Sequence, residues 1–177
     1  MYVLGNETDT NNLYQGDIIK DFPFFFIKED FSVYQAGSTT KIDSLKIDEI
    51  PAEAGALVPY KISRVIILSH TCDAQRREQV IIAPIHKIKD YENEGILNKN
   101  KIDSIKKRKI FYWFYLPAVE SLLDESLVDF QSIMYIPRIF LERFKSKKML
   151  SMSDWGRHHL GWALNNYFGR PIEDKEA

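Results

Sequence analysis

Two apolar runs, Arg64-Val-Ile-Ile-Leu-Ser-His-Thr-Cys-Asp73 and Gln79-Val-Ile-Ile-Ala-Pro-Ile-His86, stand close together in the middle of the chain. Both are rich in β-branched residues and bounded by polar ones, which is typical of β-strands. The short polar segment between them predicts that the two strands, at 64–69 and 79–85, pair as neighbours. The first run ends in side chains that can exchange protons or bind ligands, from Ser69 to Asp73. We therefore expect a β fold with a candidate site at the end of this strand.

The composition is that of a globular protein with its own core. The chain has 177 residues, 45% hydrophobic and 13% aromatic, which is enough to bury a core without disulfides or metals. The 24 basic and 25 acidic residues leave a net charge of -1, so no overall field attracts nucleic acid or an anionic membrane. We interpret residues 1–12 as a flexible lead, 13–171 as one domain and 172–177 as a tail.

Cysteine usage and hydropathy indicate the compartment. The chain has one cysteine, Cys72, which excludes an internal disulfide and is typical of a reducing compartment. Neither a signal-peptide pattern nor a long apolar stretch is found. We therefore expect a cytoplasmic protein without membrane association.

Further strands are predicted around the central pair. Runs of aromatic and β-branched residues predict strands at 14–19, 22–27 and 110–116, and another within 126–136. The polar composition of residues 36–58 predicts an inserted loop, and the lysine-rich residues before 110 predict a plain connection. A short helix is expected after Pro137.

The last helix has clear signals at both ends. Ser153 is a good N-cap and Gly169 a good stop, so we predict a helix from Asp154 to Phe168. This helix carries an aromatic face, which we expect to pack inward, formed by Trp155, His158, His159 and Trp162.

The order of three motifs resembles that of PemK/MazF-type endoribonuclease toxins. Those proteins begin with a Gly-Asp-Ile/Leu strand, have an arginine before a strand that ends in serine, and return through a strand that ends in Pro-Ile. This chain has Gln15-Gly-Asp-Ile18, then Arg64 to Ser69, then Val80 to Ile85 in the same order. The resemblance covers residues 14–86 and implies a mainly β, α+β fold. That fold is a small SH3-like barrel with an inserted loop and a C-terminal helix.

The same resemblance implies a function. It indicates an RNA-binding protein of toxin or defence type, as in toxin–antitoxin and phage-defence conflict systems, with endoribonuclease activity. The family pattern has a proline after the arginine and a hydroxyl residue after Pro-Ile, whereas this chain has Val65 and His86 there. The Ser-His-Thr-Cys-Asp stretch also resembles uncharacterised prokaryotic proteins with Ser-x-Thr-Cys-Asp at a strand end, which implies no activity.

RNA cleavage by such a site would use an arginine and a histidine. Arg64 could stabilise charge on the scissile phosphate while His70 or His86 takes the proton from the 2′-hydroxyl, because histidine titrates near neutrality. We expect no metal or cofactor. The structural alternative is that Arg64 pairs with an acidic neighbour and both histidines bond to the backbone.

A basic and aromatic segment lies further along the chain. Cations that hold phosphates beside rings that stack on bases are typical of proteins that bind single-stranded RNA. The candidate RNA-binding residues are Lys106, Lys107, Arg108, Tyr112 and Trp113. The alternative is that the lysines form a solvated loop while half of the rings serve the core.

The cluster at the end of the first strand supports two other functions. Ser69, Thr71, Cys72 and Asp73 could form the ligand- or protein-binding loop of a non-enzymatic module. Cys72 could instead be the nucleophile of a Cys-dependent hydrolase, or simply a small buried hydrophobe. No metal-binding spacing accompanies Cys72, so no metal site is predicted. The candidate partners are single-stranded RNA, another protein and a second copy of the chain in a homodimer.

Overall fold

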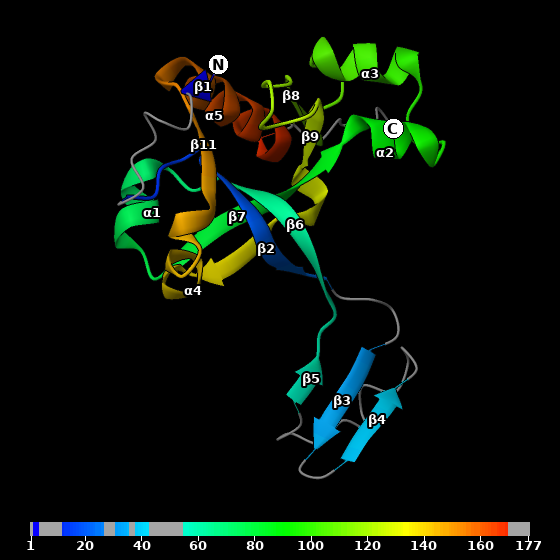
Figure 1. Cartoon of the computed structure of the whole chain (residues 1–177), viewed down its shortest axis with the longest axis vertical. Coiled ribbons are helices and arrows are strands. Elements are labelled where there is room, and N and C mark those ends of the chain that lie inside the picture. Colours follow the sequence, from blue (N-terminus) through cyan, green and yellow to red (C-terminus); the bar gives the residue numbers. More distant parts are fainter. Residues whose placement is uncertain (1, 4–11, 27–30, 36–37, 43–54, 170–177) are drawn as a thin grey trace, which may run out of the picture. The chain divides into compact units, whose positions relative to one another are not determined.

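The computed structural model describes residues 2–3, 12–26, 31–35, 38–42 and 55–169. The chain forms two compact units, shown in Figure 1. The main unit comprises Met1–Phe22 and Ser63–Ala177, and the inserted unit comprises Pro23–Ile62. The segment 13–171, which we predicted as one domain, thus divides into two compact units. Both helices and strands contribute to the main unit, and the fold is mixed α+β.

The larger of the two sheets has eight strands. Its path is β1-β11-β2-β6-β7-β9-β8, and β10 also pairs with β7. The bounds of these strands are β1 (Tyr2–Val3), β2 (Ile18–Phe25), β6 (Tyr60–Ile67), β7 (Gln79–Lys87), β8 (Trp113–Leu116), β9 (Ser126–Asp129), β10 (Met134–Pro137) and β11 (Lys148–Met152). The predicted strands at 64–69, 79–85 and 110–116 are found with shifted ends. β11 was not predicted.

Two short strands occupy one edge of β7. β10 pairs with β7 up to Ile82 and β9 pairs with it from Ile85 onward, with the 3-10 turn η3 (Phe130–Ser132) between them. The single strand predicted within 126–136 is therefore two. Pro84 lies opposite this interruption, where no strand pairs with β7 on that edge. A proline, which has no N–H to donate, is tolerated in a central strand at such a break.

Two corrections concern the N-terminal part of the main sheet. The strands expected at 14–19 and 22–27 are one strand, β2, which contains Asp21 with a left-handed φ of 52°. The expected lead 1–12 contains β1, which pairs antiparallel with β11. The expected tail 172–177 lies outside the described residues.

The main core lies on one face of the sheet, beneath helix α5 (Asp154–Phe168). This helix has the predicted bounds, because the Ser153 side chain accepts a hydrogen bond from Gly156 N and caps its first turn. The core contains side chains from six strands, from residues directly after two of them and from the helix: Ile18, Ile66, Leu68, Ala83, Ile85, Phe114, Leu116, Val128, Phe130, Leu150, Met152 and Leu160.

Four shorter helices complete the main unit. α1 (Thr71–Arg76) replaces the polar connection expected between β6 and β7, and α4 (Arg138–Glu142) follows Pro137 as predicted. α2 (Ile88–Asn93) and α3 (Lys99–Lys106) occupy the expected plain connection. Both bury isoleucines in a second cluster, on the sheet face that carries Leu127. A short 3-10 turn, η4 (Lys145–Lys147), precedes β11.

The inserted unit contains a three-stranded antiparallel sheet. Its strands are β3 (Phe31–Gln35), β4 (Ser38–Ile42) and β5 (Gly55–Leu57), in the order β4-β3-β5. The expectation of a plain loop over residues 36–58 was therefore wrong for β4 and β5, while residues 36–37 and 43–54 lie outside the described part.

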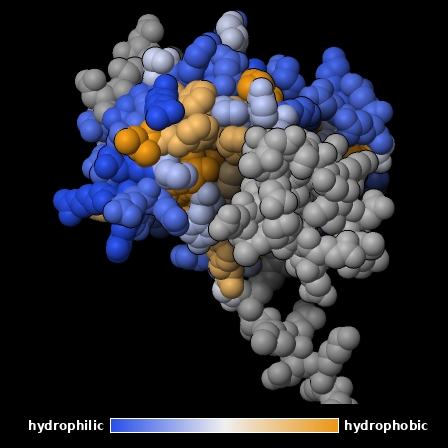
Figure 2. Space-filling view, turned by 90° about the horizontal axis from the view of Figure 1, so that it is seen from below, coloured by the Kyte–Doolittle hydropathy of each residue, from blue (hydrophilic) through white to orange (hydrophobic). Residues whose placement is uncertain are grey.

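The described surface seen in Figure 2 is mainly hydrophilic, with a few separate hydrophobic patches. Among the described residues, no helix has both the length and the apolar character needed to span a bilayer.

Candidate functional site

Arg64 and His86 lie on opposite faces of the sheet. Arg64 pairs with Ile85 across β6 and β7, and directly paired residues of an antiparallel ladder share a face. His86 follows Ile85 and points to the other face, where its ring stacks on Tyr91 with 5.1 Å between centroids. Burial raises the pKa of Tyr91 to about 12, so this ring stays neutral. The structure therefore does not bring the predicted catalytic pair together.

The surroundings of Arg64 match the structural alternative, in which this arginine lies beside an acidic residue. It lies near Asp124, whose pKa is lowered first by the hydrogen bond and charge of Lys87, at 2.8 Å, and to a smaller extent by Arg64. His70 follows Arg64 by six residues, which corresponds to roughly 20 Å of extended chain. Arg64, His70 and His86 thus belong to three separate places.

Of the five residues from Ser69 to Asp73, two pairs have different roles: Ser69 with Thr71, which flank His70, and Cys72 with Asp73. Ser69 is buried, and its Oγ accepts a hydrogen bond from Ile81 N at 2.8 Å. Thr71 Oγ1 accepts one from Gln15 N at 3.3 Å. Both hydroxyls therefore already hold the backbone in place.

The other pair is exposed at the start of α1. Cys72 is exposed, so the alternative of a buried hydrophobe was wrong. Asp73 forms an ion pair with Arg77 at 3.3 Å. No group of three metal-binding side chains occurs within the described parts of the chain.

His70 and Thr71 line an open groove against α5, which we call the α5 groove. Its volume is about 430 Å³. The opposite wall is one face of α5, at positions spaced three or four residues apart as helical geometry requires. The remaining lining residues are Gln15, Asp154, Arg157, His158, Gly161, Trp162 and Asn165.

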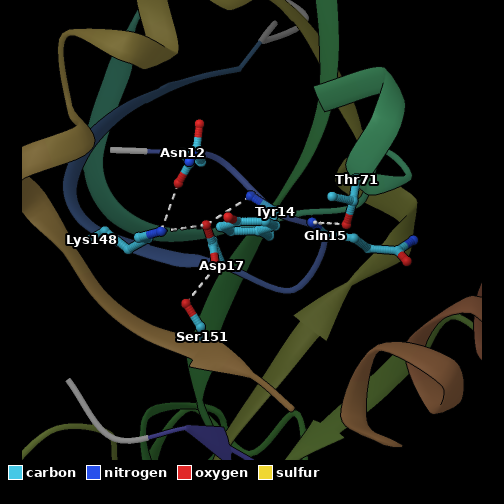
Figure 3. A network of polar contacts seen from close by, with 7 residues as sticks. All are labelled: Asn12, Tyr14, Gln15, Asp17, Thr71, Lys148 and Ser151. Atoms are coloured by element: carbon cyan, nitrogen blue, oxygen red, sulfur yellow. Dashed lines mark hydrogen bonds and ion pairs between the residues drawn. The ribbon is translucent and has the colours of Figure 1, made fainter. Parts of the chain in front are cut away.

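A buried ion pair fixes the segment that supplies Gln15 (Figure 3). Lys148 Nζ lies 2.9 Å from Asp17 Oδ2, and neither side chain has exposed surface. Ser151 Oγ donates to Asp17 Oδ1 at 2.6 Å and Tyr14 N donates to Oδ2 at 2.8 Å. Burial raises the pKa of Asp17, while these hydrogen bonds and the charge of Lys148 oppose that shift.

The same segment reaches from the ion pair to the groove wall. Lys148 Nζ also donates to the Asn12 carbonyl at 2.7 Å, and Gln15 Nε2 donates to the Leu68 carbonyl at 2.8 Å. Gly16 has a φ of +82°, and a Cβ there would meet Met152 Cβ at 2.8 Å. The Gly-Asp motif is thus explained by backbone conformation and burial.

A second, smaller hollow lies on the other side of Trp162. Its volume is about 90 Å³, and Trp162 lines both this hollow and the α5 groove. The Arg108 guanidinium lies over the Trp162 ring at 5.2 Å and donates to His159 Nδ1 at 2.7 Å. Desolvation, followed by the charges of Arg108 and His158, lowers the pKa of His159.

The five predicted RNA-binding residues are only partly brought together. Lys106, Arg108 and Trp113 line the small hollow. Lys106 forms an ion pair with Glu125 at 2.8 Å, and Trp113 packs against the second core cluster. Lys107 is exposed, while Tyr112 is half-buried and contacts Trp113 edge to face.

Sequence reasoning placed the aromatic face of α5 wrongly. Trp155 is 60% exposed and Trp162 45% exposed, so these rings do not pack inward as expected. The i, i+7 spacing that puts both on one face was visible in the sequence. Arg157 and Asn165 lie on the groove side as well and were not predicted.

Comparison with known proteins gives no further guide, since no family model and no characterised sequence matches the chain. The α5 groove, with the rings beside it and the polar side chains that line it, is therefore the candidate site.

Proposed function

We propose that the protein binds single-stranded RNA in the α5 groove and across Trp162. The observation that carries the proposal is the position of Trp162, between a groove with His70 and His158 and a hollow with Arg108. An exposed indole offers a face on which any base can stack, and neighbouring cations hold the phosphates. This combination favours a single strand over a duplex, whose bases are already stacked.

The dimensions of the site support a strand rather than a single nucleotide. A volume of about 430 Å³ lies within the range of small-molecule sites and accommodates one nucleotide. Trp155 lies seven residues before Trp162 on the same face, about 10 Å away along the helix axis. Two exposed indoles at this spacing provide two stacking platforms for one strand.

The charges of the site are local, in keeping with a net charge of -1. Arg108 lines the small hollow beside Trp162, and the exposed Lys107 precedes it in the chain. His70 and His158 line the α5 groove. Arg157 pairs with the exposed carboxylate of Asp154, whose Oδ1 lies 2.5 Å from its Nη2. We therefore expect a modest affinity with a shallow salt dependence, because few phosphates are contacted.

The proposal keeps the class that the resemblance to PemK/MazF-type toxins implies and moves the site. A toxin or defence role in the cytoplasm and a small SH3-like barrel belong to the same proposal. The barrel is supported by the main core, to which β2, β6, β7, β8, β9 and β11 all contribute. Among the described residues, however, the strand path has two ends, β1 and β8, that do not pair with each other.

A non-enzymatic module that binds a small polar ligand is the second candidate function. It is favoured by the amide side chains of Gln15 and Asn165, which line the α5 groove beside the charged residues. The loop of Ser69 to Asp73 would then act through Thr71, which also lines that groove. Competition of a mononucleotide with RNA separates a one-nucleotide site from a longer strand site.

The test is fluorescence anisotropy with a short labelled oligouridine carrying 2′-O-methyl groups, so that binding is measured without cleavage. Loss of a base–indole stack costs about 1–3 kcal/mol, so Trp162→Ala should raise Kd by about 5- to 150-fold. Tyr135→Ala is the matched control, because Tyr135 is an exposed ring on β10 that does not line the groove.

Two results would refute the proposal. One is wild-type protein that binds neither oligouridine nor a mixed single strand in low salt. The other is equal weakening by Trp162→Ala and Tyr135→Ala. Capture of another protein through the Ser69 to Asp73 segment, with no RNA affinity, would favour the binding-module alternative instead.

A further inference from the structure

We infer that His70 and His158 form a general acid–base pair that cleaves RNA bound in the α5 groove without a metal ion. The inference rests on the proposed RNA binding. The two imidazoles line one groove but come from different elements, since His70 precedes the first turn of α1 and His158 lies on α5. The two walls of the groove therefore carry one histidine each.

Both imidazoles are available to a substrate. His70 and His158 are exposed, and across the described residues neither ring forms a hydrogen bond or an ion pair with the protein. The other two histidines are engaged: His86 stacks on Tyr91, and His159 accepts a hydrogen bond from Arg108. Only one pair of the chain's four histidines is thus placed for proton transfer.

The reaction needs only these two groups. One imidazole, neutral, accepts the proton of a ribose 2′-hydroxyl, and the 2′-oxygen forms a bond to the adjacent phosphorus. The bond from phosphorus to the 5′-oxygen breaks, and the other imidazole, protonated, donates its proton to that oxygen. The products are a 2′,3′-cyclic phosphate and a 5′-hydroxyl. Proton exchange with water then restores both imidazoles, and no electron is transferred.

The rest of the groove supplies charge and a fixed wall. The Arg157 guanidinium, next to His158 in sequence, can stabilise the charge that grows on the phosphoryl oxygens. Asp154, its partner, keeps the guanidinium in position at 2.5 Å. Gln15 and Thr71 are held by the hydrogen bond between them, so the opposite wall does not need to reorganise when a strand binds.

The experiment uses the full chain, a chelator and a DNA oligonucleotide with a single ribonucleotide, which allows cleavage at one bond. We expect cleavage that leaves a 2′,3′-cyclic phosphate. His70→Ala and His158→Ala should each lower the rate by about 10²- to 10⁴-fold, the usual contribution of a general acid or base. His86→Asn is the matched control and should keep the wild-type rate, because the His86 ring stacks on Tyr91 and does not line the groove.

Binding of the 2′-O-methyl oligouridine is measured for every variant. Tight binding by the wild type without cleavage overturns this inference and leaves the proposed function intact, whereas absence of binding overturns both. Cleavage that persists in both alanine variants, or that stops in the chelator, also overturns it. If an alanine variant melts early, His70→Asn and His158→Gln replace it, and the same outcomes apply.

Discussion

Replacing Lys148 by methionine removes the cation of the buried ion pair while keeping most of its apolar stem. The Asp17 carboxylate would then stay buried with the hydrogen bonds from Ser151 Oγ and Tyr14 N but without a countercharge. Removing one partner of a buried pair costs about 3–5 kcal/mol, because the other charge remains uncompensated. That is a large part of the total stability of about 5–15 kcal/mol that a domain has.

Lys147→Met is the matched control. Lys147 precedes Lys148 in the chain and pairs with Asp21 at 3.4 Å, but the side chains of both Lys147 and Asp21 are about half exposed. An exposed pair of this kind contributes about 0–1 kcal/mol. Urea denaturation of the two variants at neutral pH therefore compares a buried with an exposed lysine at adjacent positions. A loss below about 1 kcal/mol for Lys148→Met would refute the reasoning, because no buried charge would then be left unpaired.

The pH dependence gives a second test of the same pair. Burial raises the folded-state pKa of Asp17 above the ordinary value of 3.8, so the stability linked to this carboxyl is full below pH 3.8. It is lost as the pH rises through the folded pKa, because the folded state binds the proton more tightly. Lys148→Met removes two influences that lower this pKa. The defect of the variant should therefore be largest near neutrality and shrink as the pH falls toward 3.8.

Two further predictions concern single positions. Gly16→Ala should lower the free energy of unfolding by more than about 1 kcal/mol, because the φ of Gly16 is +82° and the new Cβ would meet Met152 at 2.8 Å. Gly161→Ala should instead stabilise α5 by up to about 1 kcal/mol, because no atom lies within 4 Å of the new Cβ. The same urea titration measures both variants. Cys72 is exposed, so iodoacetamide should label it stoichiometrically in the native protein as judged by mass spectrometry. Labelling no faster than that of a free thiol would rule against the Cys-dependent hydrolase, which needs an activated thiolate.

Local sequence signals correctly predicted the helices and strands that short-range interactions determine. The C-terminal helix has the predicted bounds because its cap, Ser153, and its stop, Gly169, act within a few residues of the helix ends. The strands around Arg64 and Gln79 were found because their burial produces continuous apolar runs. α3 was missed because its buried positions, Ile102 and Ile105, are few among lysines.

The candidate site depends on contacts between segments far apart in the chain, which a local sequence pattern does not predict. The faces of Arg64 and His86 follow from the register of β6 on β7, and a shift by one residue would have put both on one face. Asp17 could be recognised as part of a motif, but its partners Lys148 and Ser151 lie more than 130 residues away on the unpredicted strand β11. The α5 groove likewise joins three distant segments.

The buried pair also decides how mutations near the groove must be interpreted. Asp17 and Lys148 do not line the α5 groove, yet they hold the segment whose Gln15 backbone N–H is bonded to Thr71. A variant at Asp17 can therefore weaken RNA binding without any contact between that carboxylate and RNA. Such an effect should scale with the loss of stability, whereas the effect of Trp162→Ala should not, because Trp162 is an exposed side chain. Plotting the change in Kd against the change in unfolding free energy therefore distinguishes residues that support the groove from those that bind in it.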